Sequence, residues 1–465
     1  MRSAFQEGSS SLHISDNVEQ PYFDQQADSG GLARSLDLAV QVLGEWRTFG
    51  RSPRDAFAKI VPSEMTPAQR ADLAAVAYGT IRDERRLEYA LGGIRGLMFG
   101  GAARDAALLL AYRVASGELA PEAADQRFVA WSPGRLPFFA VLRLDRAIDT
   151  IRDPVERFAL RHSMPDWLAR LLLTFGESAD LLGNALRSDA PRVIRANLLR
   201  GTREDLRGML TAAKVASAPC ELAPHGLAVL DFAPLFSLST YHLGWFEQQD
   251  EGSQLIAEFT APPPRGKVLD ACAGSGGKTL ALAALLQNRG TVLACDVHER
   301  RLADLKPRAA RAGAQNVQWA LVGEDSWPEP VQQFARAADR ILLDVPCSGI
   351  GAWRRRPEAR WTIKPTDLES LERIQAELID RAALLLRPGA RIVYSTCTLL
   401  RGENEAQIEA ALLRHPHLEV VRAREILGGA LADRVADATG TYLSLRPDVH
   451  DTDGFFAAVL RCKRG

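Results

Sequence analysis

Two cysteines in the C-terminal half of the chain each close a motif that follows a short apolar run. Cys347 ends the stretch Asp-Val-Pro-Cys after Arg340–Leu343, and Cys397 ends the stretch Tyr-Ser-Thr-Cys after Arg391–Val393. Ligands of an open parallel sheet bind at the carboxyl ends of its strands, so thiols at these places are candidate nucleophiles. One thiol could attack while the other helps release the product, which indicates attack on a pyrimidine ring.

The chemistry of cytosine explains why two thiols would be needed. Carbon 5 is too weak a nucleophile to accept a methyl group directly, whereas addition of a thiolate to carbon 6 makes carbon 5 enamine-like and reactive. A carboxylic acid beside ring nitrogen 3 would stabilise this intermediate, and Asp344 is placed for that role. A base must then remove the carbon 5 proton so that the first cysteine can leave, and Cys347 could assist this step.

The remaining cysteines and the bulk composition narrow the class of protein. A buried strand cysteine is more often a small core residue than a nucleophile, and Cys220, Cys272, Cys295 and Cys462 are interpreted in this way. No CxxC pair is present, so neither a disulfide framework nor a metal site is expected. The net charge is −1, and no apolar run reaches the roughly 18 residues that span a bilayer. The sequence therefore predicts a cytoplasmic protein whose nucleic-acid contacts, if any, are local.

A glycine-rich stretch, Asp270–Thr279, follows one expected strand and begins a helix. It is neither a dinucleotide-binding Gly-x-Gly-x-x-Gly motif nor a P-loop, because Cys272 stands where a P-loop needs glycine. Asp296 ends the second strand and could accept both hydroxyls of a ribose, while Asp325 follows the third and could accept from an adenine amine. Any one of these aspartates could simply be a strand-end residue. Asp344, however, ends the fourth strand, and a row of strands with acidic ends suits S-adenosylmethionine, which is cationic and carries an adenosine.

From about Tyr241 onward, strand-length apolar runs alternate with helical patterns such as Thr279–Gln287 and Leu368–Leu386. Repeated βα units predict the α/β class with a doubly wound parallel sheet. The expected strands are Lys267–Ala273, Thr291–Val297, Val317–Leu321, Arg340–Pro346, Arg391–Thr396 and Phe455–Arg461.

The sequence upstream divides into three parts. Residues 1–31 resemble a disordered leader, and the apolar spacing over 32–153 predicts a helical domain. Residues 154–240 predict a small mixed α/β module, in which 191–197 form a strand and Thr202 is the N-cap of a helix. The remaining chain, 241–465, is the α/β domain that carries the two cysteines.

Several motifs accompany these cysteines in a fixed order. They are Gln249–Gln254, Asp270–Thr279, Asp344–Gly349, Arg354–Pro357, Tyr394–Thr398, Glu403–Glu405 and His450–Phe456. Together they closely resemble the RsmB-like (Sun) family of RNA cytosine-5 methyltransferases. The resemblance implies a Rossmann-like S-adenosylmethionine-dependent methyltransferase domain with a mixed, mostly parallel seven-stranded sheet.

The resemblance also implies roles for individual residues. Cys397 would be the nucleophile, Cys347 would serve product release, and Asp344 would contact cytosine nitrogen 3. DNA cytosine methyltransferases attack instead from the Pro-Cys cysteine, so the opposite assignment stays open. Ser275 stands where the family commonly has proline, although backbone contacts to the cofactor should survive. The implied cofactor contacts are Cys272, Ala273, Gly274, Ser275, Gly276, Gly277, Lys278, Asp296, Asp325 and Asp344.

The upstream resemblance is weaker. The helical region, especially Arg70–Leu91, is similar to the NusB-type domain of bacterial ribosomal RNA members, and 154–240 is similar to their small RNA-recognition module. This favours 16S ribosomal RNA as the partner of a monomeric enzyme. The alternatives are a transfer-RNA cytosine-5 methyltransferase and a non-catalytic RNA-binding ribosome assembly factor. An amino-group methyltransferase would need Asp/Asn-Pro-Pro-Tyr in place of Asp-Val-Pro-Cys.

Basic residues interleaved with tryptophans predict where RNA binds. The segment Gly351–Lys364 has five basic residues and one acid, and arginines beside aromatic rings are typical of single-stranded RNA sites. The alternative is a solvated helix face with two core tryptophans, Trp353 and Trp361. Asn404 is expected to orient the Cys397 loop. The predicted RNA contacts are Arg354, Arg355, Arg356 and Arg360, with a second patch at Arg192 and Arg195.

Overall fold

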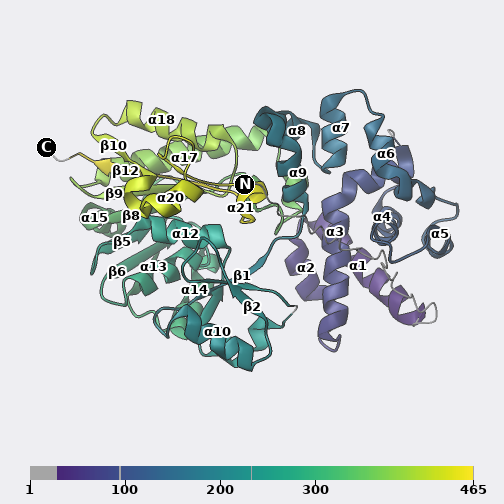
Figure 1. The fold of residues 1–465 in the computed structure, drawn as a ribbon, viewed down its shortest axis with the longest axis horizontal. Helices are drawn as coiled ribbons and strands as arrows, with labels where there is room; N and C mark the ends of the chain where they lie inside the picture. The colour runs from purple at the N-terminus through teal and green to yellow at the C-terminus, as the bar shows by residue number, and fades with distance from the viewer. Residues whose placement is uncertain (1–28, 94–95, 232, 464–465) are drawn as a thin grey trace, which may run out of the picture.

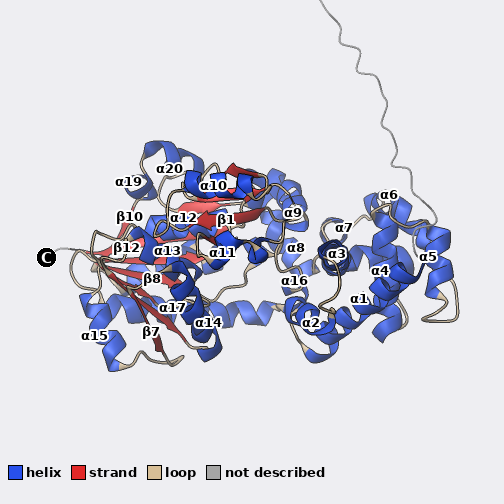
Figure 2. Cartoon of the chain, turned by 90° about the horizontal axis from the view of Figure 1, so that it is seen from below, coloured by secondary structure: helices blue, strands red, loops and turns tan. Residues whose placement is uncertain are grey.

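The computed structural model of the chain describes residues 29–93, 96–231 and 233–463. Most of the expected leader, 1–31, therefore lies outside the described residues, and the first helix begins at Ser29. The helical region and the large sheet occupy opposite ends of an elongated molecule (Figures 1 and 2). In the described ranges, no helix is both long and apolar enough to cross a membrane.

The region after Ser29 is built from helices, as the apolar spacing predicts. The longest helix, α3, begins with a capping box in which Thr66 and Gln69 satisfy each other's backbone N–H groups. Its face with Leu73 and Ile81 packs against the apolar face of α4 in one core. The helices are α1 (Ser29–Phe49), α2 (Pro53–Ile60), α3 (Pro67–Gly92), α4 (Gly101–Ala115), α5 (Pro121–Phe128), η2 (Phe138–Arg143) and α6 (Leu144–Asp149).

A second group of helices lies between the two ends of the molecule (Figure 1). Its core includes Leu168, Leu182 and Leu186, and it is completed by Trp353 and Leu400 from the C-terminal region. These helices therefore pack against the loops of the large domain. They are α7 (Pro154–Arg161), α8 (Asp166–Leu172), η3 (Leu173–Ser178) and α9 (Ala179–Arg187).

A small antiparallel sheet of order β2-β3-β1-β4 follows. The predicted strand at 191–197 is β1, and the predicted N-cap Thr202 forms a capping box at the start of α10. The small sheet extends beyond the expected boundary at position 240, because Phe246 of β4 pairs with Ala196 of β1. The elements are β1 (Arg192–Ala196), α10 (Arg203–Ala212), β2 (Ser217–Pro219), β3 (Gly226–Val229), η4 (Leu235–Ser237), α11 (Ser239–His242) and β4 (Phe246–Gln248).

The large sheet has the order β10-β12-β9-β8-β5-β6-β7, and β11 also pairs with β12. Strands β5 to β9 are mutually parallel, while β12 is antiparallel to β9. The expected seven-stranded sheet thus has an eighth strand, because β10 and β11 pair with different halves of the long β12. The strands are β5 (Lys267–Asp270), β6 (Thr291–Asp296), β7 (Val317–Leu321), β8 (Arg340–Asp344), β9 (Arg391–Thr396), β10 (Leu418–Val421), β11 (Leu443–Leu445) and β12 (Phe455–Cys462).

Helices cover both faces of this sheet. On one face, α12, α13 and α14 pack with alternate strand residues such as Val268, and on the other α15, α17 and α18 pack with neighbours such as Leu269. This is the layering of a Rossmann-like fold. The helices are α12 (Glu251–Thr260), α13 (Gly277–Leu285), α14 (Glu299–Ala312), α15 (Glu329–Ala337), η5 (Ile350–Ala352), α16 (Ala359–Thr362), α17 (Pro365–Leu385), η6 (Arg401–Glu403), α18 (Glu405–Arg414), α19 (Ala423–Leu427), α20 (Gly429–Val435) and α21 (Pro447–His450).

Candidate active site

The two predicted thiols lie together at the carboxyl edge of the large sheet. Strands β8 and β9 are parallel neighbours with Asp344 opposite Ser395, so the loops that follow them meet. The Sγ atoms of Cys347 and Cys397 are 3.4 Å apart, and the backbone N–H of Cys397 also points to Cys347 Sγ. Both are free and partly exposed. The neighbouring Cys397 thiol, together with burial, raises the pKa of Cys347 well above its usual value.

Asp344 is held by two side chains beside the thiols. Lys278 Nζ lies 2.6 Å from Asp344 Oδ2, and Ser395 Oγ donates to Asp344 Oδ1 at 2.9 Å. Burial lowers the pKa of Lys278, but the Asp344 carboxylate and the Cys397 sulfur outweigh burial, so the net shift is upward. The sequence predicts Lys278 only as a cofactor contact, whereas the structure also places its ammonium beside Asp344 and near the Cys397 sulfur.

A buried glutamate holds the Cys347 loop and was missed from the sequence. Glu403 is completely buried and accepts the backbone N–H of Ser348 at 2.8 Å and its hydroxyl at 2.5 Å. Gln375 Nε2 donates both to Glu403 Oε1 and to the carbonyl of Pro346. The acids at 403–405 resemble an ordinary helix start, and α18 does begin at Glu405, which hid the separate role of Glu403.

Asn404 does orient the Cys397 loop, as predicted. Its Oδ1 accepts from Thr396 Oγ1 at 2.6 Å, and its Nδ2 donates to the carbonyl of Thr398 at 3.1 Å. One side chain thereby fixes the backbone on both sides of Cys397. The segment His450–Phe456 also meets this site, since Gly351 and Gly454 hydrogen-bond through their backbones and approach too closely for a Cβ atom.

The glycine-rich loop joins β5 to α13 at the same edge. Gly274 and Gly276 have φ angles of +56° and +85°, which favour glycine. The carboxylate of Asp296, at the end of β6, accepts the backbone N–H of Gly274 at 2.8 Å and that of His298 at 2.8 Å. The ribose-binding carboxylate expected from the sequence thus lies directly against the loop.

The base of this loop holds a second buried carboxylate. Asp270 Oδ2 accepts from Thr279 Oγ1 at 2.7 Å, while Oδ1 is buried and has no hydrogen-bond partner among the described residues. Burial, with a smaller contribution from nearby carboxylates, raises the pKa of Asp270 to about 7. An unpartnered carboxylate oxygen, a glycine loop and Asp296 together fit a cationic adenosine ligand.

Asp325 follows β7, the strand that pairs with β6 and its terminal Asp296. It is exposed on the loop after β7, where it borders a hollow lined by Trp327 and Arg381. In the described part of the chain it makes no hydrogen bond or ion pair. Its role as a cofactor contact stays a prediction.

Two of the predicted RNA contacts after Gly351 are wrong, because they are buried. The Arg354 side chain is 1% exposed and binds the carboxylate and carbonyl of Asp451. Arg360, likewise 1% exposed, donates to the carbonyls of Ser163 and Leu186 at 3.1 and 3.0 Å and to that of Arg82 at 3.3 Å. Both cations therefore join parts of the protein.

The same segment as a whole connects distant parts of the chain. Trp353 is buried and cannot stack on a base, while the indole N–H of the partly exposed Trp361 donates to the carbonyl of Ile81 in α3 at 2.7 Å. Arg355 is three-quarters buried and bridges Asp250 and Asp453. Arg356 alone among the four predicted arginines has a mostly exposed side chain, at 72%.

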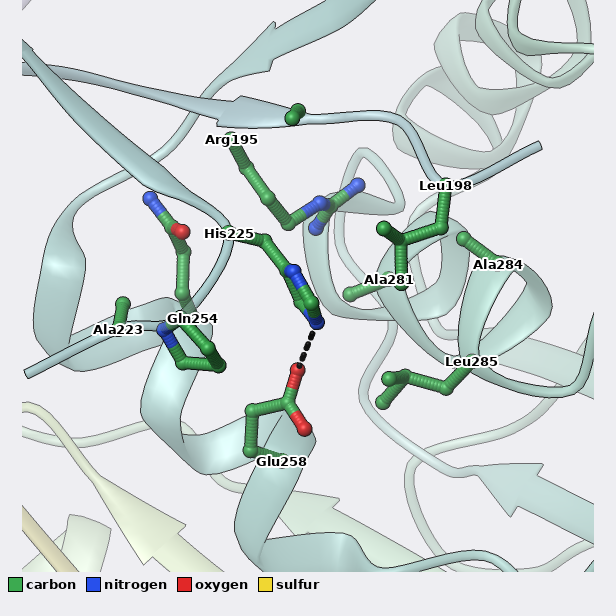
Figure 3. Close-up of a pocket in the computed structure, with 11 residues that line it drawn as sticks. Arg195, Leu198, Ala223, His225, Gln254, Glu258, Ala281, Ala284 and Leu285 are labelled. Carbon is green, nitrogen blue, oxygen red and sulfur yellow. Dashed lines mark ion pairs between the residues drawn. The ribbon is translucent and has the colours of Figure 1, made fainter. Parts of the chain in front are cut away.

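The second predicted patch divides in a similar way. Arg195 is buried in a small pocket between β1, α12 and α13, next to the ion pair of His225 and Glu258 (Figure 3). Its guanidinium donates to the side chain of Gln249 and to a loop carbonyl, so its prediction as an RNA contact is wrong. Arg192 is half-buried and donates to the carbonyls at the end of the β3 hairpin.

The glycine loop, the carboxylate at the end of β6 and the antiparallel β12 define a Rossmann-like methyltransferase that uses S-adenosylmethionine. Comparison with known proteins agrees. Residues 257–461 match the family model for the 16S rRNA methyltransferase RsmB/F. The chain is 32% identical over 325 residues, 68% of this chain and 70% of the relative, to the probable ribosomal RNA small subunit methyltransferase B of Bacillus subtilis.

The similarity extends over nearly the whole chain. Ribosomal RNA small subunit methyltransferase B of Xylella fastidiosa is 31% identical over 444 residues, which are 91% of this chain and 99% of that protein. The crystal structure of PH0851 shares the fold with a TM-score of 0.73, covering 92% of this chain and 98% of that one at 23% identity. This chain belongs to the RsmB-like (Sun) family of 16S ribosomal RNA methyltransferases, and it is an RNA methyltransferase.

Proposed function

We propose that this protein methylates carbon 5 of a cytosine in 16S ribosomal RNA through a covalent bond between Cys397 and carbon 6 of the base. The observation that carries the proposal is the 3.4 Å separation of two free thiols beside the ion pair of Lys278 and Asp344. An amino-group methyltransferase has no use for either thiol.

The environments of the thiols support different roles. The Cys397 sulfur contributes to the raised pKa of Lys278, so a cation stands near the sulfur that must become negative to attack. Cys347 has a raised pKa and is a poor nucleophile at neutral pH. After giving its own proton to water, Cys347 would be a strong base that takes the carbon 5 proton while the bond between carbon 6 and the Cys397 sulfur breaks and the double bond between carbons 5 and 6 forms again.

The carboxylate of Asp344 is proposed to contact ring nitrogen 3. Lys278, with its Nζ 2.6 Å from Asp344 Oδ2, holds a proton that the pair can share with nitrogen 3 as negative charge develops there. Ser395 fixes the other carboxylate oxygen, which sets the direction of the contact.

S-adenosylmethionine supplies the methyl group when it is bound at the glycine-rich loop. We propose that the backbone from Cys272 to Lys278 and the carboxylate of Asp296 hold it, with Asp325 toward the adenine. Asp296 is the best supported of these contacts, because its carboxylate is fixed by two backbone N–H groups.

The choice of RNA is proposed from the rest of the chain. Ribosomal RNA small subunit methyltransferase B of Xylella fastidiosa matches 91% of this chain, so the similarity includes most of the helices α1–α6. We propose that these helices form a NusB-like RNA-binding domain and that the small sheet is an RNA-recognition module. The enzyme is proposed to act as a monomer in the cytoplasm.

Bisulfite sequencing of ribosomal and transfer RNA from a strain that lacks the gene tests this function. One methylated cytosine in 16S RNA should disappear, and it should return with the wild-type gene but not with a Cys397→Ser gene. A loss confined to transfer RNA would shift the substrate to the alternative. No lost methylation at all would favour an assembly factor without activity.

A further inference from the structure

The cofactor loop is held from outside by an arginine of α14. Arg308 Nη1 donates to the carbonyl of Ser275, in the middle of the loop, at 2.5 Å. The helix also touches the loop one turn earlier. A Cβ atom added to Gly276 would lie 2.1 Å from Leu305 Cδ1. The loop therefore rests on α14 at two consecutive residues.

Arg308 is itself fixed by the small sheet. Its Nη2 and Nε donate to Glu247 Oε2 at 2.9 and 3.3 Å, and Glu247 lies in β4 with only 4% of its surface exposed. A buried carboxylate and a guanidinium in this geometry form strong, directional hydrogen bonds. The side chain that holds the loop is therefore oriented by a strand of a different sheet.

A second arginine repeats this arrangement on the other side of the loop. Arg195 of β1 donates through Nη1 to the carbonyl of Gly277 at 2.9 Å and contacts Gln249, the residue after β4. Figure 3 shows the Arg195 side chain projecting from β1 toward α13, the helix that follows the loop. The Ser275 carbonyl of the loop and the Gly277 carbonyl at the start of α13 are thus held by arginines anchored in the small sheet.

The composition of the loop explains why it needs such support. Three glycines surround Ser275, and two of them adopt positive φ, so the segment has little conformational restriction of its own. The N–H of Gly274 must stay directed at Asp296 for the carboxylate to keep its position. Fixing the Ser275 carbonyl restricts the Ser275–Gly276 peptide, two peptide units after the one that carries that N–H.

From these contacts we infer that Arg308, oriented by Glu247, is a positioning residue for S-adenosylmethionine. It touches the loop and not the reacting atoms, and through it the small sheet sets the affinity of the cofactor site. The inference does not depend on which base is methylated, because it concerns binding of the cofactor in the absence of RNA.

Arg311 provides a matched control. It lies three residues later on α14 and pairs with the other oxygen of Glu247, yet it donates to no atom of the loop. Removal of either arginine side chain leaves the buried carboxylate of Glu247 paired with the other arginine alone. Arg308→Met and Arg311→Met each remove one partner of Glu247, and Arg311→Met also removes the stacking on Tyr241, yet only Arg308→Met should affect the cofactor site.

The test is calorimetric titration of the full-length protein with S-adenosylhomocysteine. Arg308→Met should bind about five- to tenfold more weakly, the scale of the net contribution of one ordinary hydrogen bond, and Arg311→Met should bind within about twofold of wild type. In turnover, Arg308→Met should raise the KM for S-adenosylmethionine and leave kcat nearly unchanged.

Two further variants keep the inference open to refutation. Arg308→Lys should recover part of the affinity, because an ammonium can still reach one acceptor. Glu247→Gln, which keeps the shape of the anchor, should weaken binding in the same direction. Wild-type affinity in Arg308→Met, or an equal loss in Arg311→Met at matched thermal stability, would overturn the assignment.

Discussion

The sulfur atoms of Cys347 and Cys397 lie 3.4 Å apart although 50 residues separate them in sequence. The contact arises because β8 and β9 are neighbouring parallel strands, and it is maintained by Glu403 under one loop and Asn404 under the other. At this separation both thiols can reach the same pyrimidine ring, so their roles must be separated by experiment.

The first prediction assigns the attack to Cys397. Cys397→Ser should abolish turnover and any covalent RNA adduct, since a hydroxyl without a dedicated base is a poor nucleophile. Cys347→Ala should still attack and methylate once, and then accumulate a protein–RNA adduct. Denaturing electrophoresis of protein mixed with substrate RNA measures both outcomes.

The double variant serves as the control for this experiment. It should form no adduct, because release cannot stall before attack. The reverse pattern, with an adduct in Cys397→Ser and none in Cys347→Ala, would assign the attack to the Pro-Cys thiol.

A second prediction concerns the buried Glu403. Glu403→Ala removes the acceptor for the Ser348 N–H and hydroxyl, so the Cys347 loop loosens while the Cys397 loop stays held by Asn404. Turnover should fall by about 10- to 100-fold, the scale of misplacing a reacting group, and adduct should accumulate as in Cys347→Ala. Glu405→Ala is the matched control. A variant that attacks slowly without accumulating adduct would contradict this role.

Asp296 provides a direct test of the cofactor site. Asp296→Ala should weaken S-adenosylhomocysteine binding by roughly 1.5–3 kcal/mol, the contribution of hydrogen bonds to a charged acceptor. Asp296→Asn keeps one acceptor and should fall between wild type and alanine. Asp304→Ala removes an exposed carboxylate of α14 and should bind normally. Calorimetry that shows unchanged affinity in Asp296→Ala would exclude this placement.

Asp270 predicts how stability depends on pH. Its pKa is raised to about 7, chiefly by burial, so between pH 4 and 7 the folded protein holds a proton that the unfolded chain releases. Its contribution to stability is therefore fully present below about pH 4 and is lost as pH rises toward 7. The loss amounts to at most about 4 kcal/mol.

An Asp270→Asn variant isolates this contribution. Without a titrating group at this position, the fall in stability between pH 4 and 7 should be smaller than in wild type. Urea unfolding of both proteins at several pH values, in the absence of cofactor, measures the difference. Identical pH profiles would show that Asp270 does not hold a proton in the folded protein.

The sequence was sufficient to find the strand ends that carry chemistry. Cys347, Cys397, Asp344 and Asp296 each follow a run of apolar residues long enough to be recognised as a strand, and the parallel order brings these ends together. The short strands β10 and β11 escaped, since four and three residues give too little periodicity to detect.

Contacts between distant segments could not be read in the same way. Arg360 donates to carbonyls of residues 82, 163 and 186, which lie in α3, in the turn after α7 and in α9. An arginine bound to backbone carbonyls has the same sequence signature as one that binds phosphate. The basic, tryptophan-containing stretch after Gly351 therefore predicted an RNA-binding site, whereas in the structure this stretch joins separate parts of the protein.

The final prediction separates these two kinds of arginine. Arg360→Met should lower the midpoint of thermal unfolding, because it removes a donor from the buried carbonyls of Ser163 and Leu186, a loss of about 1–3 kcal/mol for each group left unsatisfied. Among the described residues, the exposed side chain of Arg356 makes a single ion-pair contact, 3.6 Å to Glu358, so Arg356→Ala should unfold like wild type. If Arg356 binds a phosphate, that variant should bind RNA more weakly and lower the salt slope by about one. An unchanged slope in Arg356→Ala would leave this segment without a role in RNA binding.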